Sequence, residues 1–315
     1  MALSIDEANA VSTPNYDTPL KQQVYQESPF YVKLQKKNKI KLDGGENIRF
    51  PIRYLEYGKA DAVGPRQQVT FEQLETRTAG QLEWKFYNSQ TMISWDERVK
   101  NTGKQAVVKL LAEKADELRQ DMDNRFATDL YTANPNGLGF SSLATIVDSA
   151  DTYAGIAVSD AATWKSYNED AATTILAMYG TGSLAEAIAD CTFGKSYPNF
   201  HLTTIDLASK FESLIEPQKR YEDKEMADAG FRNCTFHGSP VFGDYHCTAK
   251  AWYGLCIDEF EIAVHPDYDM DVSAWKELFQ GGFPNAMAKV VSWSGNILCK
   301  CRRVNFKKTA LDYTL

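Results

Sequence analysis

The chain has 315 residues, a formal net charge of −8 and a hydrophobic fraction of 43%. This apolar content excludes intrinsic disorder for the bulk of the chain, and no run approaches the ~18 apolar residues that a membrane span needs. The acidic balance disfavours a dedicated nucleic-acid reader, because binding phosphates needs clustered Lys and Arg side chains. Residues 1–17 have no basic start and no apolar block. We therefore expect no signal peptide, and we expect the six cysteines to be free thiols.

The first 38 residues predict an extended arm. They are polar, carry Pro14, Pro19 and Pro29, and sustain neither the period of a strand nor that of a helix. A short helix around 21–26 is the one regular element that we expect there. An arm of this kind matters most where it lies on a neighbouring subunit.

A long hairpin is predicted next. Apolar residues alternate with polar ones in two stretches, at Ile48, Phe50, Ile52 and Tyr54, and then at Leu82, Trp84 and Phe86. Residues 58–80 between the two strands are rich in charged and turn residues, so we expect an extended polar tip. A two-stranded ribbon is marginal on its own in water. It therefore needs a partner surface, in the same chain or in another.

One long amphipathic helix is predicted over 104–132. Thr102 and Gln105 form a capping-box start, and the segment from Asn134 to Gly137 ends the helix. Apolar residues recur between them at steps of three or four, which makes one stripe on a helix. The stripe consists of Val107, Leu111, Ala115, Leu118, Met122, Phe126 and Leu130.

The remainder mixes strands and helices in an order typical of the α+β class. We expect strands at 144–147, 155–158 and 200–203, and helices at 168–179 and 205–216. Later strands are predicted at 235–237, 240–243, 249–257, 259–264, 289–293 and 297–306. Gly295 and Asn296 read as the turn between the last two strands.

No catalytic, cofactor or metal constellation is complete. The stretch Phe193–Ser196 resembles part of a phosphate loop, but Ala189 stands where the first glycine is needed, so we expect a surface turn. Cys234, His237, His246 and Cys247 have metal-ligand chemistry, but adjacent residues on a strand point to opposite faces. The four histidines have no recognisable triad context. We therefore expect no enzyme and no cofactor.

The C-terminal segment is basic, with Lys300, Arg302, Arg303, Lys307 and Lys308 alternating on a predicted strand. Two interpretations are open. The side chains could touch phosphates without reading bases, or they could form a solvated sheet edge that discourages aggregation.

The order of these elements resembles the major capsid proteins of tailed bacteriophages, which have the HK97-like fold. The resemblance spans about Asp43 to Leu311. Gly44-Gly45 with Ile48–Ile52 is similar to the ascending strand of that family's extended loop. Val99–Gly103 leads into a helix like its spine helix, and Gly137-Leu138-Gly139 is similar to the link that follows. Phe236–Val241 with Asp244, and Arg220-Tyr221 upstream, resemble its axial domain.

This resemblance implies an HK97-like α+β fold with named parts. It implies an N-terminal arm at 1–42 and an extended β-hairpin loop at 43–94, with its tip at 58–80. A peripheral domain would follow at 95–189, carrying the spine helix at 104–132. The axial domain would occupy 190–274, and residues 275–315 would return to the peripheral domain.

The resemblance also implies a function, that of a structural head protein that assembles through pentamers and hexamers into an icosahedral shell around double-stranded phage DNA. Implied partners are further copies of the chain, a separate scaffolding protein, a portal protein and DNA held non-specifically, and they can include a decoration protein. The chain would act in the virion after assembly in the bacterial cytoplasm. The implied intersubunit contacts of the loop are Tyr57, Lys59, Asp61, Arg66, Phe71, Glu75 and Arg77. The candidates for DNA contact on the inner surface are Arg302, Arg303, Lys307 and Lys308.

Two alternatives remain open at this stage. An encapsulin-like compartment would share the fold and enclose a protein cargo. A soluble metalloenzyme would use Cys234, His237 and His246.

Overall fold

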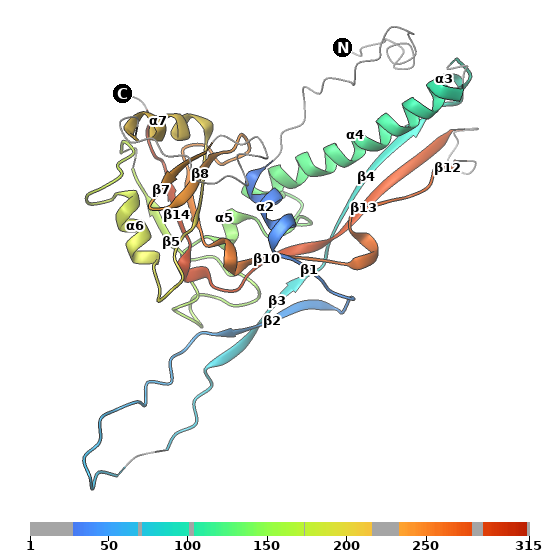
Figure 1. Cartoon of the computed structure of the whole chain (residues 1–315). Coiled ribbons are helices and arrows are strands. Elements are labelled where there is room, and N and C mark those ends of the chain that lie inside the picture. Colours follow the sequence, from blue (N-terminus) through green and yellow to red (C-terminus); the bar gives the residue numbers. More distant parts are fainter. Residues whose placement is uncertain are drawn as a thin grey trace.

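The computed structural model describes residues 28–68, 71–100, 104–172, 174–215, 233–278 and 286–313. Figure 1 shows a body with two projections. One projection is a wing built from a long helix and a twisted ribbon, and the other is a β-hairpin that extends away from the body. No helix among the described residues is long and apolar enough to cross a membrane. The class is α+β, as the sequence predicts.

The wing is organised around β13 (Met287–Cys299), which is central to a six-stranded sheet. β13 pairs along one edge with β4 (Lys85–Ile93) and along the other with three shorter strands. These are β10 (Phe260–Val264), β11 (Asp271–Val272) and β12 (Lys276–Glu277), while β1 (Lys39–Lys41) adds to β10. Helix α4 (Lys104–Tyr131) runs along one face of the ribbon, and α3 (Trp95–Lys100) lies at its outer end.

The body contains a second six-stranded sheet. Its strand order is β5 (Tyr167–Asp170), β14 (Phe306–Thr309), β9 (Trp252–Leu255), β6 (Phe200–Thr203), β8 (Ser239–Gly243) and β7 (Asn233–Phe236). Helices α6 (Leu184–Cys191) and α7 (Ile205–Ile215) pack on it. The strands predicted at 200–203, 235–237, 240–243, 249–257 and 259–264 are present with shifted ends, and so is the helix predicted at 205–216.

The long helix predicted over 104–132 is confirmed as α4. Leu118, Met122, Phe126 and Leu130 are buried, as their spacing predicts. Phe126 packs against Trp293 of β13 with ring centroids 4.8 Å apart and against Tyr87 of β4 at 4.9 Å. This aromatic cluster fastens the helix to the ribbon. Thr102 and the side chains of Val107 and Leu111 lie outside the residues described.

The hairpin consists of β2 (Asn47–Arg53) and β3 (Arg77–Glu83) in antiparallel register. Ile48, Phe50, Ile52 and Leu82 are buried on its inner face. We call residues 54–76 the tip. Its described residues, 54–68 and 71–76, belong to no strand, and it ends before the predicted residue 80 because β3 already begins at Arg77. The predicted second strand is in fact two strands. At Trp84 the chain leaves the hairpin, and β4 joins the wing.

The prediction of an extended arm is wrong for its described part. Residues Pro29–Lys37 form helix α2, and Phe30 and Leu34 on it are fully buried. Phe30 packs edge-on against Phe260 at 5.4 Å, and Ser28 Oγ donates a hydrogen bond of 2.5 Å to Asp244. Two large apolar residues four positions apart are enough to anchor a two-turn helix in this chain's own core. The short helix predicted around 21–26 lies outside the described residues.

Three local predictions between 137 and 182 are wrong. Residues Leu143–Ile146 form a helical turn, α5, whose N-cap Ser142 accepts a hydrogen bond from the Thr145 N–H at 3.4 Å. Residues 155–158 form no strand, because Gly155 lies inside a turn that Tyr153 and Ile156 close. The helix predicted at 168–179 is absent: its first residues belong to β5, which pairs with β14, and the described residues from 171 to 179 form turns and an isolated bridge at Ile175. Helix α6 was not predicted.

The turn predicted at Gly295-Asn296 is also wrong, because both residues lie inside the continuous strand β13. A Cβ atom on Gly295 would stand 2.3 Å from the Ala263 carbonyl oxygen. Glycine is therefore needed here for close approach between strands, not for a turn.

The basic C-terminal segment is not an alternating strand. Residues Arg302–Val304 form a 3-10 turn, and the Arg302 side chain is completely buried. Its guanidinium donates five hydrogen bonds of 2.8 to 3.2 Å, to the carbonyl oxygens of Thr145, Ile146, Asp148, Asp151 and Trp164. The Tyr153 and Trp164 rings lie against it at 5.5 and 5.9 Å. Burial lowers the pKa of Arg302, yet a guanidinium remains charged at neutral pH.

We expect Arg302→Lys to lower the free energy of unfolding by about 3 kcal/mol or more, because one ammonium group cannot satisfy five buried carbonyl oxygens. The neighbouring Arg303 is exposed, so Arg303→Lys should cost less than about 1 kcal/mol. Urea denaturation of both variants measures the difference. Equal stability of the two variants would contradict the role given to Arg302.

Candidate assembly surfaces

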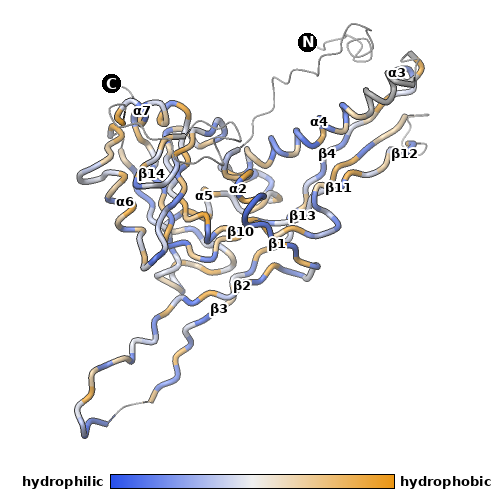
Figure 2. Tube along the Cα trace, viewed as in Figure 1, coloured by the Kyte–Doolittle hydropathy of each residue, from blue (hydrophilic) through white to orange (hydrophobic). Residues whose placement is uncertain are grey.

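The described residues of the tip, 54–68 and 71–76, expose large apolar side chains. The two arms are joined where the Tyr57 hydroxyl donates to the Glu72 carbonyl oxygen and where Lys59 Nζ lies 2.6 Å from the Glu72 carboxylate. Phe71 is nevertheless 93% exposed and Val63 is 55% exposed. Figure 2 shows hydrophobic segments continuing into this projecting loop. Apolar side chains this far from any core are typical of a surface that another molecule covers.

The root of the hairpin is fixed to the body. Thr163 Oγ1 donates a hydrogen bond of 2.5 Å to the Tyr54 carbonyl oxygen, and the Gln81 N–H donates to the Ala154 carbonyl oxygen at 2.9 Å. Together with the buried face of β2, these contacts set the direction in which the loop leaves the body. The loop is thus aimed by contacts within its own chain, and it extends away from the body (Figure 1).

The seven loop residues predicted to contact a neighbour are all exposed. Lys59 forms its ion pair within the loop, whereas Asp61, Arg66, Glu75 and Arg77 form none with the other described residues. Their role in contacts between subunits stays a prediction.

A second exposed apolar surface lies on the wing and was not predicted. On β4, Tyr87 and Ile93 face the core, whereas Phe86 and Met92 point to the opposite face, with Phe86 72% exposed. Trp95 on α3, close to the end of β4 in sequence, is also exposed, at 59%. The outer edge of β4 has no strand partner among the described residues. A signal for it existed in the sequence, because both faces of this strand carry large apolar residues.

Three of the four residues predicted to contact DNA are buried and bonded inside the subunit. Arg302 binds the five carbonyl oxygens described above. Lys307 Nζ lies 3.1 Å from Asp148, and Lys308 Nζ lies 2.6 Å from Glu169. Burial alone would raise the pKa of Asp148, but hydrogen bonds from the Ala150 N–H and from Lys307 lower it. These cations are therefore unavailable to phosphate, and neither interpretation of an exposed basic strand applies to them.

Arg303 is the member of this set that is exposed. Its guanidinium lies over the Phe193 ring at 4.5 Å. Residues Phe193–Ser196 form a tight turn, as predicted, with reciprocal backbone hydrogen bonds of 2.9 and 3.1 Å. Contact between Arg303 and DNA stays a prediction.

The residues of the metalloenzyme alternative are not brought together. Cys234 is buried on β7, His237 is exposed in the following turn, and the His246 ring lies 3.4 Å from Thr128 on α4. Within the described ranges, no three His, Cys, Asp or Glu side chains are placed to hold a metal ion. All six cysteines are unbridged, as predicted, and burial raises the pKa of Cys247 well above its usual range.

Comparison with solved structures gives full-length matches. The alignment with a chain in the "Cyanophage A-1(L) capsid asymmetric unit" spans 98% of this chain and 99% of that one, with a TM-score of 0.69 and 16% identity. The alignment with a chain in the "Capsid of native GTA particle computed with C5 symmetry" spans 99% of this chain and all of that one, with a TM-score of 0.57 and 11% identity. A chain described as "Mycobacterium phage Adephagia" aligns end to end with a TM-score of 0.57 and 13% identity.

The chain has the HK97-like capsid fold. No family model matches the sequence, and no curated protein matches it. The capsid fold is thus evident in the backbone although identity with these structures is low.

A buried histidine in the body of this capsid fold gives a testable pH dependence. His201 on β6 is fully buried among the rings of Phe236, Trp252 and Phe306. Trp252 Nε1 donates a 3.4 Å hydrogen bond to His201 Nδ1, while His201 Nε2 has no hydrogen-bond partner in the described residues. Burial lowers the pKa of His201 to about 3.

We therefore expect stability to fall as the pH falls from about 6.5 towards 3. In that window the unfolded chain binds a proton at His201 that the folded chain excludes. This difference lowers the free energy of unfolding by roughly 2 kcal/mol at pH 5. His201→Phe should reduce the loss of unfolding free energy between pH 7 and pH 5 by about that amount. Urea denaturation at the two pH values measures the loss, and an unchanged loss in the variant would refute this assignment.

Proposed function

We propose that this chain is the major capsid protein of a tailed bacteriophage or of a related GTA-like particle. The observation that carries the proposal is a projecting hairpin with an exposed apolar tip, in a chain that aligns end to end with capsid structures. A loop that is aimed by its own subunit and lacks a surface there is built to contact another copy.

The contact that such a loop makes is heterologous, because the tip of one copy meets a different surface on the next. Contacts of this kind close into rings when the rotation between copies allows it. We propose pentamers and hexamers as these rings, joined into an icosahedral shell. The unpaired edge of β4, with Phe86 and Met92 beside it, offers a second surface for such contacts.

The proposed shell encloses double-stranded phage DNA. With the net charge of −8 and three of the four basic candidates buried, we propose that contact with DNA is non-specific. Further proposed partners are a separate scaffolding protein, a portal protein and a decoration protein. The role is structural rather than enzymatic, and the chain acts in the virion after assembly in the host bacterial cytoplasm. The similar structures favour this function over an encapsulin-like compartment, because their descriptions name phages and GTA particles.

Negative-stain microscopy of the expressed chain tests the proposal directly. We expect shells, or rings of five or six copies, in the chain alone or together with its scaffolding protein. A chain that remains monomeric at every concentration, with scaffolding protein present, would overturn the proposed function.

The role of the tip can be tested without disturbing the core. Replacing residues 55–75 with Asn-Gly joins Tyr54 to Thr76 by a two-residue turn at the point where their backbones already hydrogen-bond at 3.2 Å. We expect a folded chain with an unchanged unfolding midpoint that forms no shells. Normal shells from this variant would contradict the role of the tip.

A point variant separates the apolar contribution of the tip from its length. We expect Phe71→Ser to weaken assembly, since Phe71 is 93% exposed and gains burial only in a contact between copies. The matched control is Leu138→Ser, because Leu138 is 68% exposed on the body outside the loop. Sedimentation of both variants over a range of concentrations gives the comparison.

A further inference from the structure

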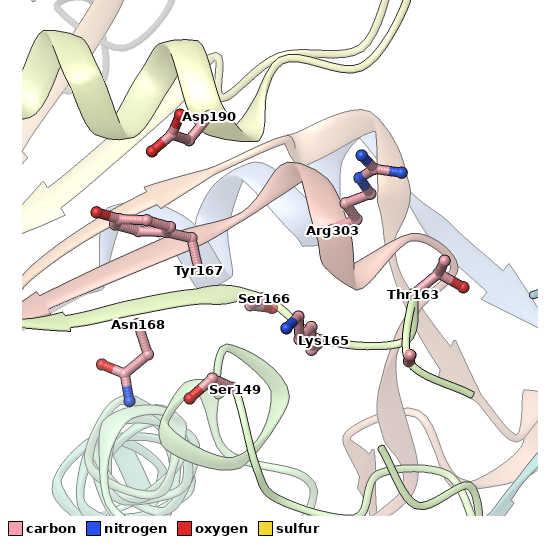
Figure 3. Close-up of a pocket in the computed structure, with 9 residues that line it drawn as sticks. Ser149, Thr163, Lys165, Ser166, Tyr167, Asn168, Asp190 and Arg303 are labelled. Atoms are coloured by element: carbon pink, nitrogen blue, oxygen red, sulfur yellow. The ribbon is translucent and has the colours of Figure 1, made fainter. Parts of the chain in front are cut away.

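A pocket of about 430 Å³ opens on the body, and three charged side chains surround it (Figure 3). Lys165 comes from the segment before β5, Asp190 from α6, and Arg303 from the 3-10 turn after β13. Figure 3 shows these groups, from three separate elements, around one open space.

None of these three charges forms an ion pair with another described residue. Arg303 is instead positioned by a ring, because its guanidinium lies 4.5 Å from the centre of Phe193, which belongs to the tight turn described above. The cation is therefore held in place before any partner arrives, which reduces the entropy that a contact must lose.

Asp190 is placed where a carboxylate is unfavourable. It lies in the last turn of α6, whose C-terminal end carries negative partial charge, and that turn has no basic residue. A cation from a partner molecule would relieve this repulsion. The pocket therefore offers two positive groups and one negative group without internal compensation.

The apex of the hairpin, which we define as residues 60–67, carries a complementary set. Asp61 and Arg66 flank the turn at Gly64-Pro65, and neither forms an ion pair with a described residue. The Asp61 carboxylate only accepts a hydrogen bond from the neighbouring Ala62 N–H at 2.9 Å. Val63 between them is 55% exposed and can cover the apolar part of the pocket wall, such as Ala162.

The apex cannot reach the pocket of its own subunit. Thr163, which lines the pocket, hydrogen-bonds Tyr54 at the root of the hairpin. From Tyr54 the extended chain carries the apex roughly 30 Å away, at about 3.3 Å per residue. Figure 1 shows the loop pointing away from the body. The occupant that fits is thus the apex of a second copy.

We propose that the apex of one copy docks into this pocket of the next, with Asp61 facing Lys165 and Arg303, and with Arg66 facing Asp190. This inference rests on the proposed function and names the receptor for the loop. It assigns Arg303 to contact between subunits.

Charge exchange tests the pairing. We expect Asp61→Lys and Arg303→Glu, each alone, to raise the protein concentration needed for assembly roughly tenfold or more, because each places like charges together. The double variant Asp61→Lys with Arg303→Glu should return to within about threefold of the wild type. The second pair, Arg66→Glu with Asp190→Lys, should behave in the same way. Light scattering gives the assembly threshold, and microscopy checks the product.

Two controls keep the result specific. The mismatched double variant Asp61→Lys with Asp190→Lys also carries one substitution in the tip and one in the pocket, like the matched pairs. Its assembly should not recover, because both proposed contacts then bring positive charges together. Lys36→Glu reverses an exposed charge outside loop and pocket and should leave the threshold unchanged. Unfolding midpoints of all variants show whether each one still folds.

The outcomes separate this inference from the proposed function. A wild-type chain that never assembles would overturn both. If the wild type forms shells and Arg303→Glu assembles equally well, the proposed docking of the apex into this pocket is wrong, while the proposed function stands. Single variants that fail without recovery in either matched double variant would overturn the pairing of Asp61 and Arg66 with these groups.

Discussion

The buried guanidinium of Arg302 is the constraint on which the outward-facing parts of the body depend. Its five hydrogen bonds join the 145–151 segment and Trp164 to the turn before β14. These bonds hold in place a region with little regular structure of its own. That same region supplies Ala154 and Thr163, which anchor the root of the hairpin, and Lys165 in the pocket wall. One side chain thus positions both the loop that leaves the subunit and the surface that we propose receives the next one.

Charge in this chain has two separate uses. Arg302, Lys307 and Lys308 are buried, and they organise loops by binding carbonyl oxygens and carboxylates. Buried charges are costly unless every bond is made, so they specify one arrangement more than they add stability. The exposed charges at the hairpin apex and in the pocket form no ion pairs with the other residues that the structure describes. The net charge alone cannot distinguish these two uses, because it counts both equally.

Sequence patterns correctly predicted those helices and strands that bury one face and expose the other. The alternation in β2 and the stripe on α4 succeed because each strand or helix packs one side on a core. Predictions failed where tertiary contacts decide the backbone. Gly295 reads as a turn residue, yet it lies between two strands that leave no room for a side chain. Lys307 and Lys308 were predicted to be exposed, at a solvated edge or against phosphate, because their partners Asp148 and Glu169 are more than a hundred residues away in the sequence. The pocket could not be predicted from the sequence either, because its charged residues Lys165, Asp190 and Arg303 come from segments far apart in the chain.

The position of Thr163 bears on how assembly could propagate. This residue holds the root of its own hairpin and also lines the pocket. In the proposed contact, the apex of one copy therefore arrives beside the point from which the next copy's loop leaves. A filled pocket would stabilise the segment that aims the next loop, so each contact would favour the following one in the same direction. Such head-to-tail contacts form a closed ring only when the rotation per copy divides a full turn. The direction in which the hairpin root holds the loop fixes that rotation. It would therefore set the number of copies in the ring, whereas the strength of the tip contact would not.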